Sequence, residues 1–293
     1  MLDLVRLRVL AAVAAHGSVT AAAESLNYTQ PTVSHHLARL EAATGAKLVQ
    51  RAGRGIRLTP DGKLLARRAA EIIGRVDAAD AELAERVGLQ NGRVRVGSFS
   101  SALSVLVPAA TAELRRRHPS IELEMTDVHP NVATRQLREG AIDLAIVFSY
   151  DAEPVDDGIR YTHLINDAMY LLSSRSGDTL ADHRDSTWIA GCENCRHELL
   201  GFCSSAGFSP QVAFTSDDIV VKQAFVAAGL GVTTMPGMAL RSHHVDGVQA
   251  TELPFVRTIS LATYGDPPEP PATAAFIEAL HNVSRRAGPS HRG

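Results

Sequence analysis

Apolar residues in the first sixty positions recur at helical spacing in short runs. The first run has apolar residues at intervals of three, namely Leu4, Leu7, Leu10 and Val13. This spacing predicts a helix with one buried face that ends at Gly17. A second helix is predicted in "TAAAESL" with Ser18 as N-cap, and a third from Thr29 to about Ala43, because Ser and Thr are preferred N-caps. The following run, "KLVQRAGRGIRLTP", predicts a β-hairpin around a glycine-rich turn.

The third predicted helix, in "YTQPTVSHHLARLE", has two different faces. Val33, Leu37 and Leu40 fall on one face and are expected to pack on the two earlier helices. Hydrogen-bonding side chains occupy the other face, and Gln, Ser, Thr and Arg are residue types that read base edges or bind phosphate. We therefore predict that this helix and the hairpin bind DNA through Thr29, Gln30, Pro31, Thr32, Ser34, His35, Arg39, Arg51, Arg54 and Arg57.

The charge distribution favours a polyanionic partner for this first segment alone. Residues 1–58 contain seven Lys and Arg against three Asp and Glu, a balance of +4, whereas the whole chain has a net charge of −3. The remaining residues therefore sum to −7. A small basic module joined to an acidic body is typical of a nucleic-acid-binding head on a body with another task.

A long helix is predicted in residues 60–88. Apolar residues recur there at intervals of four or three, namely Leu65, Ala69, Ile72, Val76, Ala79, Leu83 and Val87. This pattern is a coiled-coil seam that one helix cannot bury by itself. We predict that it pairs two chains, and packing against its own chain is the alternative. The expected dimer contacts are Leu65, Ile72, Val76 and Leu83.

From residue 92 onward, strand patterns alternate with helix patterns, which predicts parallel α/β sheets. The strands of a first unit are "RVRVGSF", "IELEMTDV" and "IDLAIVF", and those of a second are "AMYLLSS", "STWIAG", "VAFTS" and "GVTTMP". The run "TISLATYG" is expected to return to the first unit before a terminal helix near residues 271–286. The predicted crossovers between the units lie near residues 162–165 and 262–266.

The segment "VTAAAESLNYTQPTVSHHLARLEAATGAKLVQRAGRGIRLTPDGKLL" resembles the winged helix-turn-helix of the LysR-type transcriptional regulators. The close match covers residues 2 to about 65, with Val49 in place of the family's usual aromatic residue. The resemblance implies a linker-helix dimer, often assembled into tetramers, and a two-lobed effector domain like the periplasmic binding proteins. We therefore expect an α/β protein with an all-α winged helix-turn-helix N-terminal domain and a long linker helix. The expected boundaries are 1–59 for the DNA-binding domain, 60–88 for the linker dimerisation helix, 89–293 for the effector-binding domain, about 92–162 and 266–293 for lobe 1, and about 163–265 for lobe 2.

The resemblance also implies a small-molecule co-inducer, commonly a carboxylate, in the cleft between the lobes. Ligands of open α/β sheets bind beyond the C-terminal strand ends, and polar groups follow several predicted strands here. Ser100 and Ser101 match the family's first-strand loop, although a plain helix N-cap is an equally good interpretation of either serine. Asp217 and Asp218 are interpreted as helix caps. The candidate effector residues are Ser98, Ser100, Ser101, His129, Asn131, Phe148, Cys192, Arg196 and Thr215.

The motif "GCENCRHELLGFC" favours a different kind of sensor. Cys192 and Cys195 have C-x2-C spacing with His197 and Cys203 nearby, and a helix N-terminus lowers the pKa of a thiol. A structural zinc site has a second spaced pair of ligands, and none is apparent in the sequence. We therefore assign no metal ligands and no cofactor. A thiol- or metal-responsive regulator that senses through Cys192, Cys195 and Cys203 remains the alternative function.

Other classes of protein fit the sequence less well. It contains no phosphate-binding loop, no nucleophile elbow and no H-E-x-x-H motif, so no enzyme is predicted. A solute-binding protein would need a signal peptide and would have no use for residues 1–60. No apolar run reaches ~18 residues. The sequence thus predicts a cytoplasmic homodimer or homotetramer that binds double-stranded DNA sequence-specifically and is controlled by a co-inducer, expected to be anionic.

Overall fold

A computed structural model of the chain describes residues 2–52, 55–86, 92–150, 158–265 and 267–287. It has two compact units, one with residues 1–92 and 134–143 and one with residues 93–133 and 144–293. Among the described residues, no single helix is long and apolar enough to cross a membrane. The first two helices pass that test only when joined, and they are bent 120° from each other.

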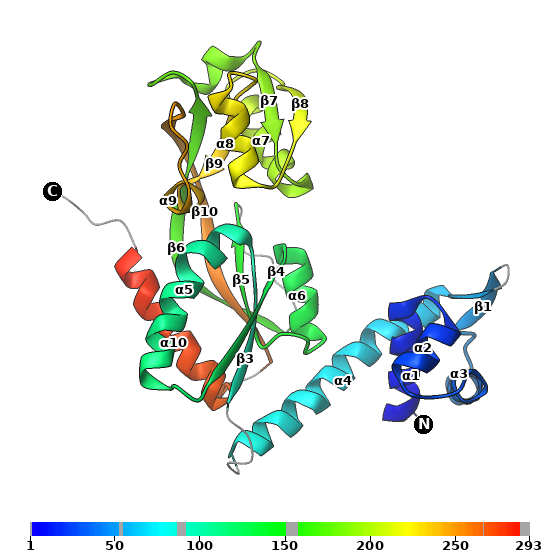
Figure 1. Ribbon diagram of the computed structural model, residues 1–293. Coiled ribbons are helices and arrows are strands. Elements are labelled where there is room, and N and C mark those ends of the chain that lie inside the picture. Colours follow the sequence, from blue (N-terminus) through cyan, green and yellow to red (C-terminus); the bar gives the residue numbers. More distant parts are fainter. Residues whose placement is uncertain (1, 53–54, 87–91, 151–157, 266, 288–293) are drawn as a thin grey trace. The chain divides into compact units, whose positions relative to one another are not determined.

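The first unit contains three short helices, a β-hairpin and a long helix (Figure 1). Their bounds are α1 (Leu4–His16), α2 (Val19–Ser25), α3 (Gln30–Thr44), β1 (Val49–Ala52), β2 (Gly55–Leu58) and α4 (Pro60–Arg86). These elements confirm the predicted winged helix-turn-helix and the predicted long helix. The hairpin is antiparallel, with Gln50 opposite Arg57.

Local signals in the sequence account for the ends of these helices. The side chains of Ser18 and Thr29 accept hydrogen bonds from backbone N–H groups at the starts of α2 and α3. Gly17 and Gly45 end α1 and α3 at φ values of 64° and 69°, where a residue with a Cβ is strained. Asn27 takes the left-handed conformation (φ 54°) in the turn between α2 and α3, as expected.

The core of the first unit is formed by the apolar faces of α1, α2 and α3. Leu10, Val33 and Leu40 are fully buried in it. The start of α4 also belongs to this core, because Ala69 is fully buried there and Leu65 packs against it. Part of the predicted seam therefore packs on its own chain, and Leu65 is better explained as a core residue of the head than as a dimer contact.

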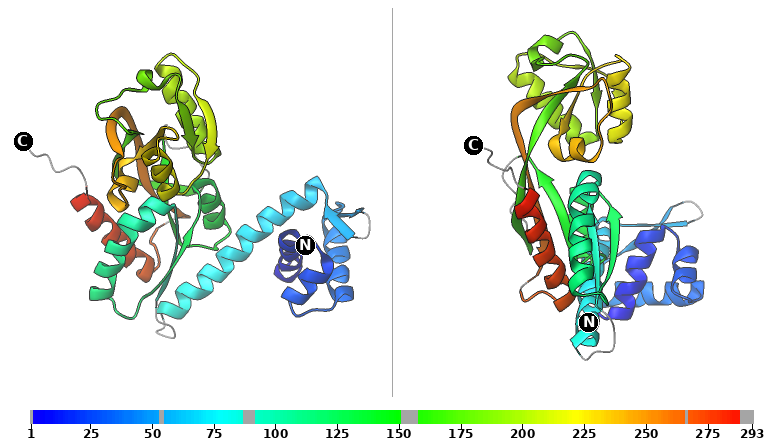
Figure 2. Two further views of the ribbon diagram at one scale, coloured as in Figure 1. Left: turned by 45° about the horizontal axis from the view of Figure 1, so that its top comes forward. Right: turned by 60° about the vertical axis from the view of Figure 1, so that its left-hand side comes forward.

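The second unit consists of two α/β lobes joined by two long strands (Figures 1 and 2). The elements of lobe 1 are β3 (Arg93–Ser98), α5 (Ser100–Arg117), β4 (Glu122–Asp127), β5 (Leu144–Ser149) and α10 (Pro271–Ala287). Those of lobe 2 are a 3-10 turn (Leu180–His183), β7 (Thr187–Ala190), α7 (Glu193–Ser205), β8 (Gln211–Thr215), α8 (Ile219–Ala227), β9 (Thr233–Pro236) and α9 (Gly237–Ser242). The joining strands are β6 (Ile159–Ser173) and β10 (Gln249–Tyr264), and α6 (Pro130–Arg138) crosses the division between the two units.

The sheet pairings correct one predicted crossover. The main sheet has the order β4-β3-β5-β10-β6-β9, in which β3, β4 and β5 are parallel and β10, β6 and β9 join antiparallel. The first predicted crossover, near residues 162–165, falls within β6. The second is not at residues 262–266, because β10 already pairs with β5 from Thr258 and is continuous from Gln249. The chain returns to lobe 1 near the register shift between Glu252 and Val256.

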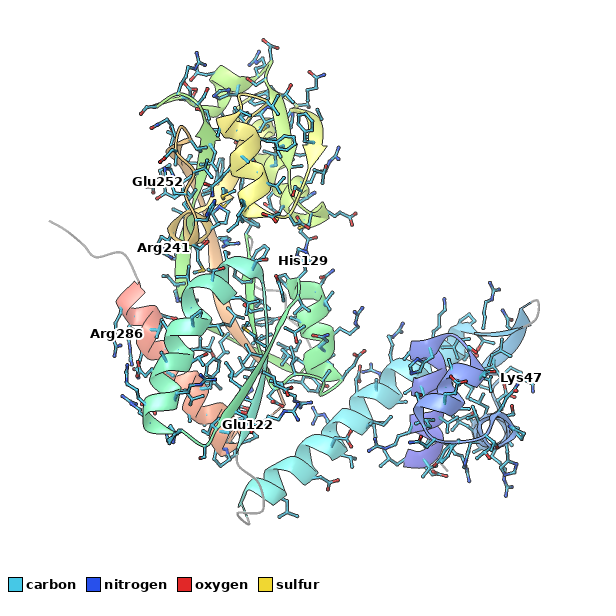
Figure 3. All side chains as sticks on the ribbon, in the orientation of Figure 1. Lys47, Glu122, His129, Arg241, Glu252 and Arg286 are labelled. Atoms are coloured by element: carbon cyan, nitrogen blue, oxygen red, sulfur yellow. The ribbon has the colours of Figure 1, made fainter. Side chains whose placement is uncertain are left out.

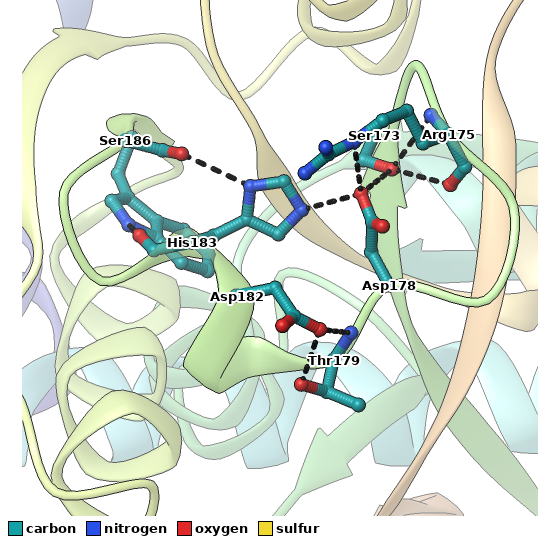
Figure 4. A network of polar contacts seen from close by, with 8 residues as sticks. Ser173, Arg175, Asp178, Thr179, Asp182, His183 and Ser186 are labelled. Carbon is teal, nitrogen blue, oxygen red and sulfur yellow. Dashed lines mark hydrogen bonds and ion pairs between the residues drawn. The ribbon is translucent and has the colours of Figure 1, made fainter.

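A polar network fixes the loop between β6 and β7 in lobe 2 (Figure 4). The His183 ring lies 3.0 Å from the Ser186 hydroxyl and 2.9 Å from a carboxylate oxygen of Asp178. Burial raises the pKa of Asp178, but hydrogen bonds from Ser173 and His183 outweigh burial and leave it below its usual value. Although the hydrogen-bonded series Ser186, His183 and Asp178 resembles a catalytic triad, none of the residues of the network lines the cavity described below. We interpret the network as a structural support of the loop.

Candidate DNA interface and effector cavity

The outward face of α3 carries the side chains predicted to read DNA. Gln30, Ser34, His35 and Arg39 are exposed, while Leu37 on the opposite face is buried. Around them, Thr29 and Pro31 are exposed at the start of the helix and Thr32 is half-buried. The hydroxyls of Thr29 and Thr32 bond to each other, whereas the exposed side chains of Gln30, Ser34, His35 and Arg39 are accessible to a partner, as recognition of the major groove requires.

Of the three hairpin arginines predicted to bind DNA, the structure describes the side chain of one. Arg57 is exposed on β2. Arg54 and the side chain of Arg51 lie outside the described residues, so their predicted contact with DNA stays a prediction.

Glu41, near the end of α3, connects the predicted recognition helix to the start of the hairpin through hydrogen bonds. One carboxylate oxygen accepts hydrogen bonds from the backbone N–H groups of Leu48 (2.8 Å) and Val49 (3.3 Å), and the other lies 2.9 Å from Nζ of Lys47, which Figure 3 labels. Burial raises the pKa of Glu41, but these hydrogen bonds outweigh burial and lower it below its usual value. No local pattern in the sequence indicates this contact.

Further along α4, apolar side chains face away from the core of the head. Ile72 is 41% exposed and Leu83 is 62% exposed, and Val76 is half-buried. Large apolar side chains exposed at seam spacing are the feature expected of a helix that meets a second chain. The dimer contact itself remains a prediction.

A cavity of about 300 Å³ lies between the two lobes of the second unit. Its walls are largely apolar, and a row of aromatic rings in edge-to-face contact runs from lobe 1 to lobe 2: Phe99, Phe148, Tyr150 and Phe202. Four of the predicted effector residues line it, namely Ser100, Ser101, His129 and Phe148. The cavity is thus an apolar slot with a few polar groups, as is usual for small-molecule sites.

Arg257 on β10 is a buried cation at the floor of this cavity. Its guanidinium donates to Oδ2 of Asp167 from Nε (2.9 Å) and Nη2 (2.8 Å), and Nη2 also donates to the hydroxyl of Ser101 (2.9 Å). The guanidinium carbon lies 4.9 Å from the ring centres of Phe99 and Phe148. Because Asp167 neutralises it, Arg257 contributes an ordered hydrogen-bond donor to the cavity rather than a free charge.

Lys222 on α8 is the second buried cation, and it has no such neutralising partner. The residue is 8% exposed, and its Nζ donates to the backbone carbonyl of Thr234 at 3.1 Å. Burial lowers the pKa of Lys222, while the Cys195 and Cys192 thiols and the Asp217 carboxylate oppose this effect without outweighing it. An enclosed ammonium that is compensated only in part is costly for the empty protein and is satisfied further by a bound anion.

The remaining predicted effector residues do not line this cavity. Ser98 is fully buried in β3, and its hydroxyl has no hydrogen-bond partner among the described residues. Asn131, Arg196 and Thr215 are exposed elsewhere, and Cys192 is half-buried and does not line the cavity, whereas Cys195 does. The strand ends were located correctly, but neighbouring residues supply the lining, because successive side chains leave a strand or a turn in different directions.

Two acidic residues at the cavity take different roles. Asp218 is the N-cap of α8, since one carboxylate oxygen accepts from the N–H groups of Val220 (2.7 Å) and Val221 (3.2 Å). Asp217 was interpreted as a cap as well, but it lines the cavity, and its Oδ2 lies 3.6 Å from Nε2 of His129. Figure 3 labels His129 at the end of lobe 1 that faces lobe 2.

The three thiols differ in their surroundings. Sγ of Cys192 lies 3.3 Å from Sγ of Cys195, and the hydrogen bond between them lowers the pKa of Cys192 to about 6. The same contact and burial raise the pKa of Cys195. Cys203 is fully buried in the apolar core of lobe 2, and burial raises its pKa to about 11. Only Cys192 and Cys195 are placed to act together.

Family comparisons agree with this geometry over nearly the whole chain. A family described as "Bacterial regulatory helix-turn-helix protein, lysR family" matches residues 4–63, and the "LysR substrate binding domain" matches residues 88–285. The chain belongs to the LysR family of transcriptional regulators. It is therefore a DNA-binding regulator with an effector-binding domain, and its family is one of regulators rather than enzymes.

Individual LysR relatives cover most of the chain. YofA, a transcriptional regulator of Bacillus subtilis, is 30% identical over 256 residues, which are 85% of this chain and 86% of YofA. A probable hydrogen peroxide-inducible genes activator of Mycobacterium avium is 30% identical over 245 residues, 80% of this chain and 78% of that protein. The structure of full-length CbnR with its target DNA aligns at a TM-score of 0.66 and 21% identity over 96% of this chain and all of CbnR, a likeness of fold.

Two residues of this LysR-type regulator that face the cavity were missed in the sequence. Lys222 follows "DIVV" in an otherwise apolar helix, and Arg257 interrupts the strand pattern "LPFVRTISLA". A charged residue at a position whose spacing predicts burial is the signal that could have identified both.

Proposed function

We propose that this LysR-type regulator is controlled by a small molecule with one acidic group and an apolar or aromatic body, bound between its lobes. The observation that carries this proposal is the enclosed ammonium of Lys222. The neighbouring Arg257 is neutralised by Asp167, whereas Lys222 has no hydrogen-bonded carboxylate among the described residues. The Asp217 carboxylate and the Cys192 and Cys195 thiols offset its charge only in part, and Asp127 and Asp217 are exposed, so solvent screens them.

Lobe 1 offers hydroxyl groups to the same ligand. Ser101 already accepts a hydrogen bond from Arg257, and its own proton is available for a ligand oxygen. Ser100 donates to Asp127 at 3.0 Å, so a ligand must compete with that contact. A ligand held by Lys222 on lobe 2 and Ser101 on lobe 1 favours one lobe arrangement, and it shifts the DNA-bound form by its differential affinity, typically about 1–3 kcal/mol.

A matched ligand screen on the full chain tests this proposal. Small aromatic and aliphatic carboxylates are compared with their neutral methyl esters by thermal shift, and hits are then measured on promoter DNA by gel shift. We expect only the acids to raise the unfolding midpoint with concentration, and Ser100→Ala with Ser101→Ala to abolish the effect on DNA while basal DNA binding persists. Equal stabilisation by acid and ester, or by amines alone, would contradict the proposal.

DNA recognition by the exposed face of α3 belongs to the same proposal. Ser34→Ala or Gln30→Ala is expected to relax operator specificity by about 1–3 kcal/mol, if each contacts a base edge as its exposure allows. Since DNA is the target, we also propose that the protein acts in the cytoplasm. Dimerisation through α4, and further assembly to a tetramer, is proposed from the exposed seam at Ile72 and Leu83.

A thiol sensor is the second candidate function, and the contact between Cys192 and Cys195 favours it. A peroxide would oxidise the Cys192 thiolate to a sulfenic acid with loss of water, and the Cys195 thiol would then displace a second water to form a disulfide. Peroxide treatment followed by intact mass measurement tests this: Cys203→Ser should still lose two hydrogens per chain, and Cys192→Ser should not. Retention of the two hydrogens in Cys203→Ser would exclude this candidate.

A further inference from the structure

Three metal-binding side chains from separate segments meet at the rim of the cavity. His129 follows β4 in lobe 1, Cys192 caps the N-terminus of α7 and Asp217 precedes α8 in lobe 2. One ligand atom of each, a ring nitrogen, a sulfur and a carboxylate oxygen, lies within 4.8 Å of the other two. This grouping is different from the cysteine set considered in the sequence, because Cys203 is buried in the apolar core.

We propose that His129, Cys192 and Asp217 bind one zinc-like divalent cation that links the two lobes at the rim of the cavity. Nitrogen, sulfur and oxygen donors together suit zinc or cobalt, whereas magnesium and calcium prefer oxygen donors alone. Three protein ligands leave a fourth tetrahedral position for water or a small ligand.

The spacing of the three donors suits such an ion after a small adjustment. Tetrahedral bonds of ~2.0–2.3 Å separate ligand atoms by roughly 3.3–3.8 Å. The distance between Nε2 of His129 and Oδ2 of Asp217 is already 3.6 Å, and the widest separation in the group is no more than 4.8 Å. All three residues are at least partly exposed, so an ion has access and a side-chain rotation can close the gap.

The ordinary alternative is a surface ion pair between His129 and Asp217. Their side chains are 47% and 52% exposed, and such a pair contributes little to stability. That alternative does not involve Cys192, whose sulfur lies within 4.8 Å of a donor atom of each of the two residues. It also predicts no preference for metals, and this difference can be measured directly.

A bridging ion would have a consequence for the lobes. His129 belongs to lobe 1 and the other two ligands to lobe 2, so the ion is held fully only in lobe arrangements that bring these segments together. Metal affinity and lobe arrangement are therefore linked, and the linkage is reciprocal. Since His129 and Asp217 also line the cavity, a ligand bound in the cavity would lie close to the proposed ion.

Cobalt titration of the full chain tests the site without effector or DNA. The protein is treated with chelator, reduced with a phosphine and titrated with Co²⁺, and the absorption from thiolate-to-cobalt charge transfer is recorded. We expect saturation at one ion per chain and displacement of the band by Zn²⁺. Cys192→Ser should abolish the band, and His129→Ala or Asp217→Asn should weaken binding by more than about tenfold, since each removes one of three protein ligands.

Matched variants serve as controls. His197→Ala removes an exposed histidine of the same helix α7, and Cys203→Ser removes the buried thiol, and both should bind Co²⁺ like the wild type. Lys222→Met keeps all three proposed ligands and should retain the cobalt band, with equal or tighter binding because a nearby positive charge is removed, so failure of the metal site is distinguishable from failure of the effector proposal. Thermal midpoints in metal-free buffer confirm that each variant is folded. Absence of saturable binding, a band that persists in Cys192→Ser, or a band lost in His197→Ala or Cys203→Ser would overturn the proposal.

Discussion

Replacement of Lys222 by Met tests whether this lysine serves ligand binding or the stability of the fold. Methionine has nearly the same length and no charge, so it fills the same space in α8. The substitution removes the hydrogen bond to the Thr234 carbonyl, which still accepts one from the Thr233 hydroxyl (3.3 Å), so the loss costs about 1 kcal/mol. It also removes a buried ammonium, whose desolvation costs several kcal/mol and is offset only in part by Asp217 and the nearby thiols. We therefore expect the empty variant to be as stable as the wild type or more stable.

Effector binding should respond in the opposite direction. A hydrogen bond to a charged group contributes about 1.5–3 kcal/mol, which corresponds to a roughly 10- to 150-fold loss of affinity in Lys222→Met. Fluorescence of Trp188, the single tryptophan, buried in lobe 2, can follow the titration, and thermal unfolding gives the stability. Lys63→Met, at an exposed position of α4, is the control and should change neither quantity. A variant that binds the acid normally, or that is clearly less stable when empty, would refute this account of Lys222.

The pH dependence of stability in the wild type and in Lys222→Met tests independently whether the buried charge of Lys222 destabilises the folded protein. Burial lowers the pKa of Lys222 in the folded state, so below that pKa the folded protein carries a charge that it disfavours. As pH rises from the folded pKa toward the unfolded value, the unfolded chain binds more protons and the penalty disappears. The stability difference between wild type and Lys222→Met should therefore shrink with rising pH, and effector affinity of the wild type should fall over the same range.

Three further predictions concern the framework around the sites. Glu41→Gln should destabilise the head by about 1–2 kcal/mol near neutral pH, because charged hydrogen bonds become neutral ones. In thermal melts, this difference in stability should shrink as pH falls through the lowered folded pKa of Glu41, and a difference that stays constant would contradict the prediction. Asp167→Asn should lower the midpoint of the effector domain by the equivalent of about 3–5 kcal/mol, since it leaves Arg257 as an uncompensated buried charge. Ile72→Asp should shift the chain toward monomers in light scattering, and an unchanged mass would mean that another surface holds the dimer.

The parts of the fold that depend on local signals could be predicted from the sequence. Ser18 and Thr29 cap helices because of their own side chains, and Gly45 ends a helix because of its backbone freedom. The family resemblance extended these local predictions to the two-lobed domain. The second crossover was misplaced because the residues before Thr258 include Pro254, which a period-two pattern treats as a break.

The parts of the candidate site that depend on long-range contacts could not be predicted in the same way. Strand ends located Ser100, Ser101 and His129 at the cavity, since C-terminal strand ends meet there. Arg257 and Asp167 meet only because they are register partners on β10 and β6, a pairing that no local pattern encodes. Similarly, the pairing of His129 with Asp217 joins segments of different lobes.

The position of Arg257 connects the cavity to the strands that join the lobes. It stands directly after the irregular stretch where β10 leaves lobe 2, opposite Asp167 on β6. Asp167 also accepts a hydrogen bond from the N–H of Met238 in α9 (2.8 Å), and Arg257 donates to Ser101 at the start of α5. Both charges are nearly inaccessible to water, so neither lobe can rotate at this point without breaking a buried bond or moving the pair as a unit. The Ser101 hydroxyl can keep this bond from Arg257 while it donates its own proton to the proposed ligand, which would then be connected through Ser101 to both the joining strand and lobe 1. A ligand held on lobe 2 alone would lack this connection.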